Sequence, residues 1–224
     1  MARNAVRLTP LCADALNILA ELSSSPQEAL LYYERALHAA EFALAPKTLT
    51  DYAGGFWVYI ETRPYMTALL GFATALSDLD KTGEAIECCR RLLALNSRDH
   101  QGVRHLLLAL LMRRNDLAGA TRLLQDYPDD RSASQLYTEA LIAFRKSEGA
   151  DQKARIAARE AYVENAHVPK MLASRNEPPA PAGGTVIPGS PDEAARYVRS
   201  MGKVWRGTQG AVAWLMDIVG SGWN

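Results

Sequence analysis

The sequence predicts an all-α protein, a right-handed α-solenoid of helical hairpins that ends in a C-terminal helical cap. Three alanines, Ala85, Ala120 and Ala154, each open a short amphipathic helix, and they lie 35 and 34 residues apart. A period near 34 residues is typical of paired helices that stack on their neighbours. Such a stack is a scaffold for holding partners, so the period predicts the architecture and leaves the partner open.

The composition favours a neutral protein of a reducing compartment. Among the 224 residues, 25 Lys and Arg balance 25 Asp and Glu, so no net field attracts nucleic acid or an acidic membrane. Polar residues interrupt the first 25 positions, and no later apolar run has the length of a membrane span. Cys12, Cys88 and Cys89 lack a CxxC spacing, which fits free thiols. We expect a soluble, cytoplasmic protein without a membrane partner.

The first hairpin is expected within the first 45 residues. Ser25 is placed to cap its second helix, with Pro26 at the first helical position and Glu28 three residues after the cap. Small and apolar residues mark one buried face on each helix: Ala13, Leu16 and Ala20 on the first, and Ala29, Tyr33 and Ala36 on the second.

An insertion interrupts the period between the first and second hairpins. Ala29 and Ala85 hold equivalent positions but lie 56 residues apart, so we assign the additional residues to an insertion at 46–63. Aromatic side chains in and after this segment can either pack between the hairpins, which is the preferred interpretation, or contact a partner. The candidate partner contacts are Trp57, Tyr59 and Tyr65.

The clearest hairpin covers residues 65–99. Ala73 and Ala85 are small enough to let two helix axes approach closely. With Met66 as the first position, the hairpin resembles the tetratricopeptide repeat, which has small residues at its eighth and twentieth positions. The residues that carry this resemblance are Leu69, Phe72, Ala73, Leu76 and Ala85. The resemblance implies a fold of stacked helical hairpins.

Two further hairpins are expected at 101–127 and 132–166. Each contains one of the periodic alanines at the start of its second helix. Ser132 and Gln135 have the spacing of a capping box and indicate where the later hairpin begins. With the upstream hairpins, these complete a predicted repeat domain over residues 1–169.

The composition changes after the repeats. Residues 170–190 are rich in Pro and Gly and are expected to form a linker or a surface strap. Ser190 and Glu193 then have the spacing of a capping box, and Thr208 is expected to cap the last helix. We expect residues 191–224 to cover the open end of the repeats as a helical cap.

The sequence shows no pattern typical of catalysis or of metal and cofactor binding. His100 and His105 are five residues apart, which misses the i, i+4 spacing of two ligands on one helix face. Cys88 and Cys89 point about 100° apart on a helix, and Cys89 falls in the apolar stripe. No phosphate-binding loop, dinucleotide motif or nucleophile elbow occurs. We therefore predict no catalytic residue, no metal and no cofactor.

The resemblance to tetratricopeptide repeats also implies a concave groove lined by the first helix of each hairpin. The candidate groove residues are Thr67, Leu70, Thr74 and Asp78 in one hairpin, and Arg104, His105, Met112 and Arg113 in the next. Arg104, His105 and Arg113 suit an acidic side chain or a C-terminal carboxylate. The alternative is a solvated face without a partner.

Longer stretches, including GGFWVYIETRPYM and PDEAARYV, resemble a bacterial-type subgroup of tetratricopeptide-repeat proteins related to suppressor-of-tumorigenicity repeat proteins. This resemblance implies an interaction scaffold. We expect a non-catalytic adaptor that binds a peptide or protein segment or another copy of itself. The alternatives are an RNA-binding helical-repeat protein, which the neutral charge disfavours, and the regulatory subunit of an enzyme.

Overall fold

The computed structural model describes residues 1–44, 51–179 and 185–220. In these residues the chain is helical, and no strand occurs beyond an isolated backbone bridge between Gly55 and Asn96. The all-α prediction is therefore confirmed for the described residues. Parts of three predicted segments lie outside them: 46–50 of the insertion, 180–184 of the linker and 221–224 of the cap.

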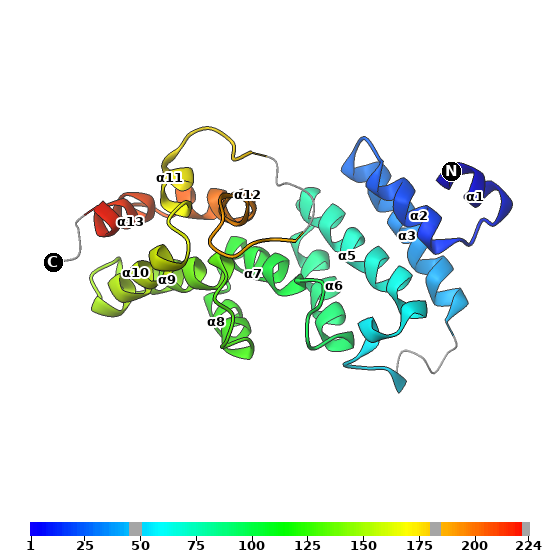
Figure 1. Cartoon of the computed structure of the whole chain (residues 1–224), viewed down its shortest axis with the longest axis horizontal. Helices are drawn as coiled ribbons and strands as arrows, with labels where there is room; N and C mark the ends of the chain where they lie inside the picture. The colour runs from blue at the N-terminus through cyan, green and yellow to red at the C-terminus, as the bar shows by residue number, and fades with distance from the viewer. Residues whose placement is uncertain (45–50, 180–184, 221–224) are drawn as a thin grey trace. The chain divides into compact units, whose positions relative to one another are not determined.

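The chain divides into two compact units, Met1–Leu110 and Leu111–Asn224. The described helices of the first unit are α1 (Ala2–Leu8), α2 (Ala13–Glu21), α3 (Pro26–Ala43), α5 (Arg63–Asp78) and α6 (Thr82–Leu95) (Figure 1). Two turns of 3-10 helix, η1 (Phe56–Val58) and η2 (Ile60–Thr62), precede α5. Helix α7 (Val103–Arg113) begins in the first unit and ends in the second.

In the first unit, helical hairpins pack through small residues. Helices α2 and α3 form a hairpin, α5 runs beside both of them, and α6 folds back against α5 (Figure 1). Alanines are fully or almost fully buried along these helices, among them Ala36, Ala39 and Ala40 of α3 and Ala68, Ala73 and Ala75 of α5. Because a methyl side chain keeps a helix surface thin, these residues permit a close approach of the helices.

The predicted start of α3 is confirmed. Ser25 Oγ accepts a hydrogen bond from the Glu28 amide at 3.2 Å, and Pro26 lies in the first turn. The Glu28 carboxylate accepts from the amide of Ser24, also at 3.2 Å, and not from that of Ser25. The return bond of the capping box is therefore displaced by one residue.

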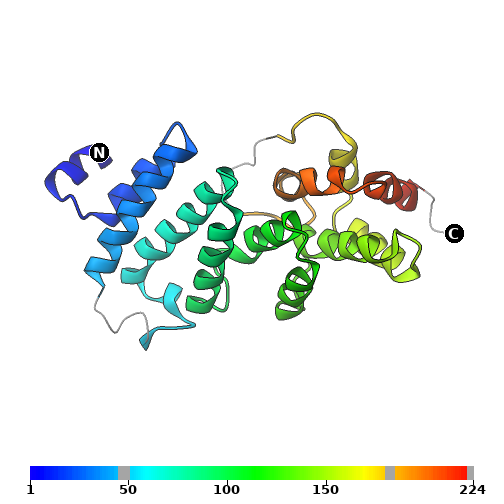
Figure 2. The same ribbon diagram turned by 180° about the vertical axis from the view of Figure 1, so that it is seen from behind.

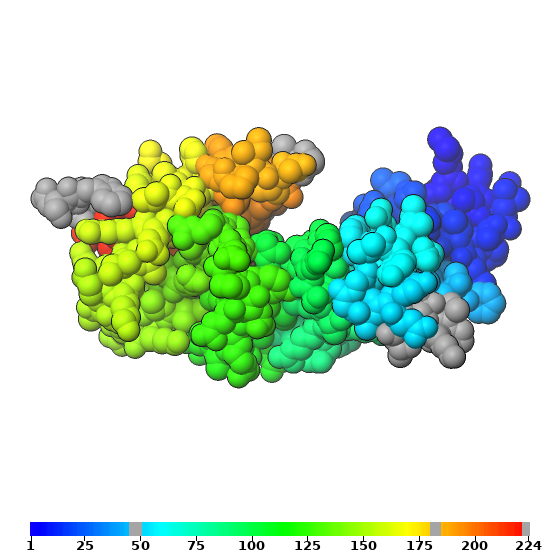
Figure 3. Space-filling model, turned by 60° about the horizontal axis from the view of Figure 1, so that its bottom comes forward, coloured from blue at the N-terminus to red at the C-terminus, as the bar shows by residue number. Residues whose placement is uncertain are grey.

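The described part of the insertion packs onto the hairpin of α5 and α6. Phe56 is fully buried, and its ring meets that of Tyr65 edge to face with 6.0 Å between the centroids. The Thr62 hydroxyl donates to the Phe56 carbonyl, and the Ser97 amide donates to the Gly54 carbonyl at 3.3 Å. In the space-filling view this segment, coloured cyan, lies at the surface of the unit (Figure 3).

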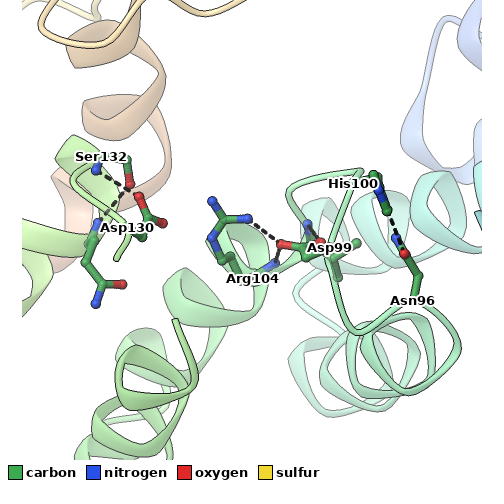
Figure 4. A network of polar contacts seen from close by, with 8 residues as sticks. Asn96, Asp99, His100, Arg104, Asp130 and Ser132 are labelled. Atoms are coloured by element: carbon green, nitrogen blue, oxygen red, sulfur yellow. Dashed lines mark hydrogen bonds and ion pairs between the residues drawn. The ribbon is translucent and has the colours of Figure 1, made fainter. Parts of the chain in front are cut away.

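A buried carboxylate organises the start of α7. Asp99 accepts hydrogen bonds from the Val103 amide at 2.7 Å, the Arg104 amide at 3.1 Å and the Arg104 guanidinium at 2.8 Å (Figure 4). Its side chain is 0% exposed. Asp99 has a φ of +49°, in the left-handed region that Asp tolerates better than most residues. His100 and Asn96 make a separate contact of 2.8 Å between Nδ1 and Oδ1 beside it.

The second unit contains the chain's remaining described helices. They are α8 (Leu117–Asp126), α9 (Ala133–Ser147), α10 (Gln152–Glu164), α11 (Val168–Ala173), α12 (Pro191–Gly207) and α13 (Ala211–Gly220) (Figure 2). Helices α9 and α10 form a hairpin, while α11 packs against both α12 and α13. Contacts of α12 with α9 and of α13 with α10 place the C-terminal helices on that hairpin.

The capping predictions in the second unit have mixed outcomes. Ser132 caps α9 by accepting from the Gln135 amide at 3.3 Å, as predicted. The Gln135 side chain does not return to Ser132, because its amide donates to the Leu124 carbonyl at 3.1 Å. The prediction that Thr208 caps the last helix with its side chain is wrong. Its hydroxyl donates to the Val204 carbonyl at 2.8 Å, at the end of α12.

Replacing Asp99 with alanine tests the role of the buried carboxylate. The substitution leaves two amides and a guanidinium without their acceptor, so we expect Asp99→Ala to lower the free energy of unfolding by roughly 2–4 kcal/mol. Chemical denaturation followed by circular dichroism measures this loss.

Asp80 provides the matched control, because it is exposed and has a similar left-handed φ of 57°. We expect Asp80→Ala to cost about 1 kcal/mol or less. Equal losses in the two variants would trace the effect to the backbone conformation and contradict the capping role of Asp99.

Candidate peptide-binding grooves

A cavity of about 360 Å³ opens in the first unit where the turn between α2 and α3 meets the second half of α5. We name it the α2–α5 groove. Its lining is mainly polar or small and includes Glu21, Ser24, Ser25, Gly71, Thr74 and Asp78. Away from the groove, the side-chain amide of Asn17, in the middle of α2, donates to the Pro64 carbonyl at 2.9 Å. This bond joins α2 to the start of α5 and limits their sliding.

Tyr33 forms a wall of this groove because Gly71 leaves room for its ring. A Cβ atom at Gly71 would lie 2.1 Å from the ring carbon Cζ, which no packed structure tolerates without movement. Burial raises the pKa of the Tyr33 phenol above its ordinary value, and the nearby Glu21 carboxylate raises it further. The phenol therefore stays neutral beside Glu21 at physiological pH.

The residues predicted on α5 divide along the helix. Thr74 and Asp78 are exposed and line the α2–α5 groove. Thr67 and Leu70 are half-buried and do not belong to its lining. The Thr74 hydroxyl donates to the Leu70 carbonyl at 2.9 Å, which orients it along the helix.

The residues predicted on α7 do not form one open site. Met112 is 1% exposed, so its assignment to an open groove is wrong: it is a core residue. The Arg104 guanidinium is paired with the buried Asp99. This pairing does not fit the predicted role of Arg104 in binding an acidic ligand. His105 is half-buried, and Arg113 is exposed at the end of the helix, in the second unit.

The aromatic candidates also separate into core and surface. Tyr65 is 0% exposed, so its assignment as a partner contact is wrong. Tyr59 is 39% exposed and stacks on Tyr52 with 3.8 Å between the ring centroids. Trp57 is half-buried, with the guanidinium of Arg63 over its ring at 5.4 Å. The outer aromatic rings of the segment are therefore held by contacts within it.

The C-terminal helices cover one side of α9. Tyr137 of α9 lies against Tyr197 of α12 with 5.8 Å between centroids, and Phe144 lies against Trp214 of α13 at 4.9 Å. Arg145 donates two hydrogen bonds to the Thr208 hydroxyl, at 3.0 and 2.7 Å. Because of these contacts, the C-terminal helices cover this side of α9, and it is not open to a ligand.

Glu193 joins the C-terminal helices to the α9–α10 hairpin. Its Oε1 accepts from the Ala133 amide at the start of α9 at 3.0 Å. Its Oε2 accepts from the Asn165 side-chain amide at 2.9 Å and from the Gly189 amide at 2.8 Å. The residue is 8% exposed, so three N–H groups replace the water that solvates an ordinary carboxylate.

A second, larger groove lies in the second unit and was missed in the sequence. It has a volume of about 620 Å³ and opens between α8 and α9; we name it the α8–α9 groove. Residues of α8, of α9 and of the segments that follow each helix line this groove. From α9 they are Gln135, Glu139, Ile142, Ala143 and Lys146, from α8 they are Thr121, Leu124 and Gln125, and the others are Pro128, Asp151 and Lys153. The three- and four-residue spacings of its α9 residues are a helical face, but the same pattern is typical of an ordinary solvated surface.

Chemistry beyond binding has few candidates in the described residues. In that part of the chain no group of three or more His, Cys, Asp or Glu side chains is arranged to hold a metal ion. The described helices include none that is both long and apolar enough to cross a bilayer. Cys89 is buried in α6, as expected from the apolar stripe, and burial raises the pKa of its thiol to about 12.

Comparison with models of known protein families finds no match, and comparison with curated proteins finds no significant similarity.

Differential alkylation tests the environment of the cysteines. Because the thiolate is the reactive form and a pKa near 12 leaves about one thiolate in a thousand at pH 9, we expect Cys89 to resist iodoacetamide in the native protein. Mass spectrometry of the digested protein measures the modification. Guanidinium chloride should make Cys12, Cys88 and Cys89 react alike, and native labelling of Cys89 at the rate of Cys12 would contradict its burial.

Removing the Glu193 carboxylate tests the attachment of the C-terminal helices. We expect Glu193→Ala to lower the free energy of unfolding by roughly 2–4 kcal/mol, because two buried donors and one part-buried donor lose their acceptor. Hydrogen exchange should become faster in α12 and α13 before it does in α10. Asp217→Ala, on the exposed side of α13, is the control and should leave exchange unchanged. Uniform acceleration across the second unit would refute a local attachment.

Proposed function

We propose that this protein is a non-catalytic interaction scaffold of the tetratricopeptide-repeat type, an α-solenoid that binds a peptide segment of a partner protein. The observation that carries the proposal is the α2–α5 groove. The first helices of two hairpins, α2 and α5, lie side by side, and the cavity opens at one end of them. Thr74 and Asp78 of this groove are two of the positions that the repeat pattern assigns to ligand binding.

The lining of the α2–α5 groove favours an extended segment with a basic side chain. Glu21 and Asp78 supply negative charge from the two sides, and Ser24, Ser25 and Thr74 supply hydroxyl groups. Backbone amides and carbonyls of an extended peptide can pair with such hydroxyls, while a Lys or Arg side chain meets a carboxylate. Because Glu21 is exposed, we expect the charge to contribute more to specificity than to affinity.

The same groove disfavours the RNA-binding alternative. A phosphate backbone next to Glu21 and Asp78 meets like charge, whereas readers of single strands combine basic grooves with stacking rings. The proposal includes a cytoplasmic location, which the three free cysteines support. A homo-oligomer stays a prediction that size-exclusion chromatography with light scattering can measure.

A charge reversal and a space-filling substitution test the proposed groove. Peptides selected from a displayed library of extended ten-residue sequences should be rich in Lys or Arg, and Glu21→Lys should weaken their binding roughly tenfold. Thr74→Tyr should also weaken it, since a large ring fills the cavity. Fluorescence anisotropy with labelled peptides measures both effects.

Glu34→Lys is the matched control, because Glu34 is an exposed glutamate of α3 outside the groove lining. It changes the net charge as Glu21→Lys does and should leave binding unchanged. Equal loss in both lysine variants would reject the groove and indicate non-specific attraction. Retention on heparin at moderate salt, with no peptide selected, would favour the RNA-binding alternative.

A further inference from the structure

The α8–α9 groove exists because two consecutive helices of the second unit diverge. In the first unit α3 packs along α5, whereas α8 meets α9 over a short stretch and then points away from it in both ribbon views (Figures 1 and 2). The helices stay joined where the Gln135 amide donates to the Leu124 carbonyl. Beyond that junction the wedge is open to solvent.

The floor of this groove is apolar and its ends carry opposite charge. Leu124 and Ile142 form the floor with Ala143 beside them. Glu139 stands at one end, half-buried, with Gln135 donating to its Oε1 at 2.9 Å. Burial raises the pKa of Glu139, and the hydrogen bond from Gln135 opposes this only in part. A carboxylate in this setting gains from an added cation.

Lys146 and Lys153 stand at the opposite end of the groove. Both are exposed, and the neighbouring Asp151 accepts from the Lys153 amide at 3.0 Å as the cap of α10. Two lysines against one aspartate leave this end positive, while Glu139 makes the other end negative. Glu139 and Lys146 are seven residues apart on one helix, which corresponds to about 10 Å along its axis.

We propose that the α8–α9 groove is a second docking site, which takes one amphipathic helix of a partner protein. The helix presents a Lys or Arg to Glu139 and an Asp or Glu to Lys146 and Lys153. These two residues are about seven positions apart in the partner, and a Leu or similar side chain between them contacts Leu124 and Ile142.

Charge and shape together select this occupant over an extended peptide. Two diverging helices provide walls into which a third helix packs, with its own ridge of side chains between theirs. A ligand of one charge sign would leave one end of the groove facing like charge. The α2–α5 groove of the first unit has carboxylates on both sides and no lysine in its lining, so the two grooves differ in the partner chemistry that they fit.

A displayed library of sixteen-residue helices, randomised at four positions of one face, tests the proposal with the full-length chain. On the wild type we expect selected helices to combine one basic and one acidic residue seven positions apart with an apolar residue between. On Glu139→Lys the basic residue should be replaced by an acidic one. Selection that ignores this substitution, or that yields no such spacing, would overturn the proposal.

The best selected helix, labelled and measured by anisotropy, provides the quantitative test. We expect Glu139→Lys to weaken its binding roughly 10- to 100-fold, and a Lys→Glu change in the helix to recover most of that loss. Glu139→Gln, which keeps the size of the side chain, should lose less and guards against misfolding. A loss that the compensating helix does not recover counts against a direct contact.

Two control variants separate this site from other effects. Asp217→Lys makes the same charge change as Glu139→Lys and lies in the same compact unit, on the exposed face of α13. It should leave helix binding unchanged. Glu21→Lys in the α2–α5 groove should also leave it unchanged. Loss of helix binding in Glu21→Lys would show a single shared site and refute a second one.

Discussion

The structure depends on helices that approach one another closely through alanine. In α10 the buried residues are Ala154, Ala158 and Ala161, so the buried face of this helix consists of methyl groups. A larger residue at such a position would separate the two axes and strain every contact along them. The periodic alanines that predicted the hairpins are therefore also the residues that set the distances between helices.

The elements could be predicted because their signals are local. Ser25 and Ser132 cap the helices that they were expected to cap. Two of the periodic alanines, Ala85 and Ala154, lie near the start of the second helix in the α5–α6 and α9–α10 hairpins. The site could not be predicted to the same extent, because exposure depends on contacts between distant residues. Tyr65 and Met112 are residue types that occur both in protein interfaces and in cores, and tertiary packing places both of them in the core. The sequence around Arg104 also does not show that Asp99, its partner, is buried and not solvated.

The α8–α9 groove is the converse case, a candidate site that the sequence did not predict. Glu139 and Lys146 are unremarkable on a helix surface, and their meaning arises from the divergence of α8, which no local pattern encodes. The two grooves also differ in chemistry. One is polar with carboxylates on both sides, and the other has an apolar floor with charges of opposite sign at its ends. A scaffold with two such sites can hold two different segments, which raises effective concentration when both belong to one partner.

The attachment of α12 and α13 has a consequence for synthesis on the ribosome. Tyr137 and Phe144 belong to α9, whereas the rings that cover them, Tyr197 and Trp214, are translated much later. At common elongation rates this delay is on the order of several seconds. During that interval the sides of the two α9 rings that α12 and α13 later cover are exposed, and a chaperone can shield them before the final helices close over that surface.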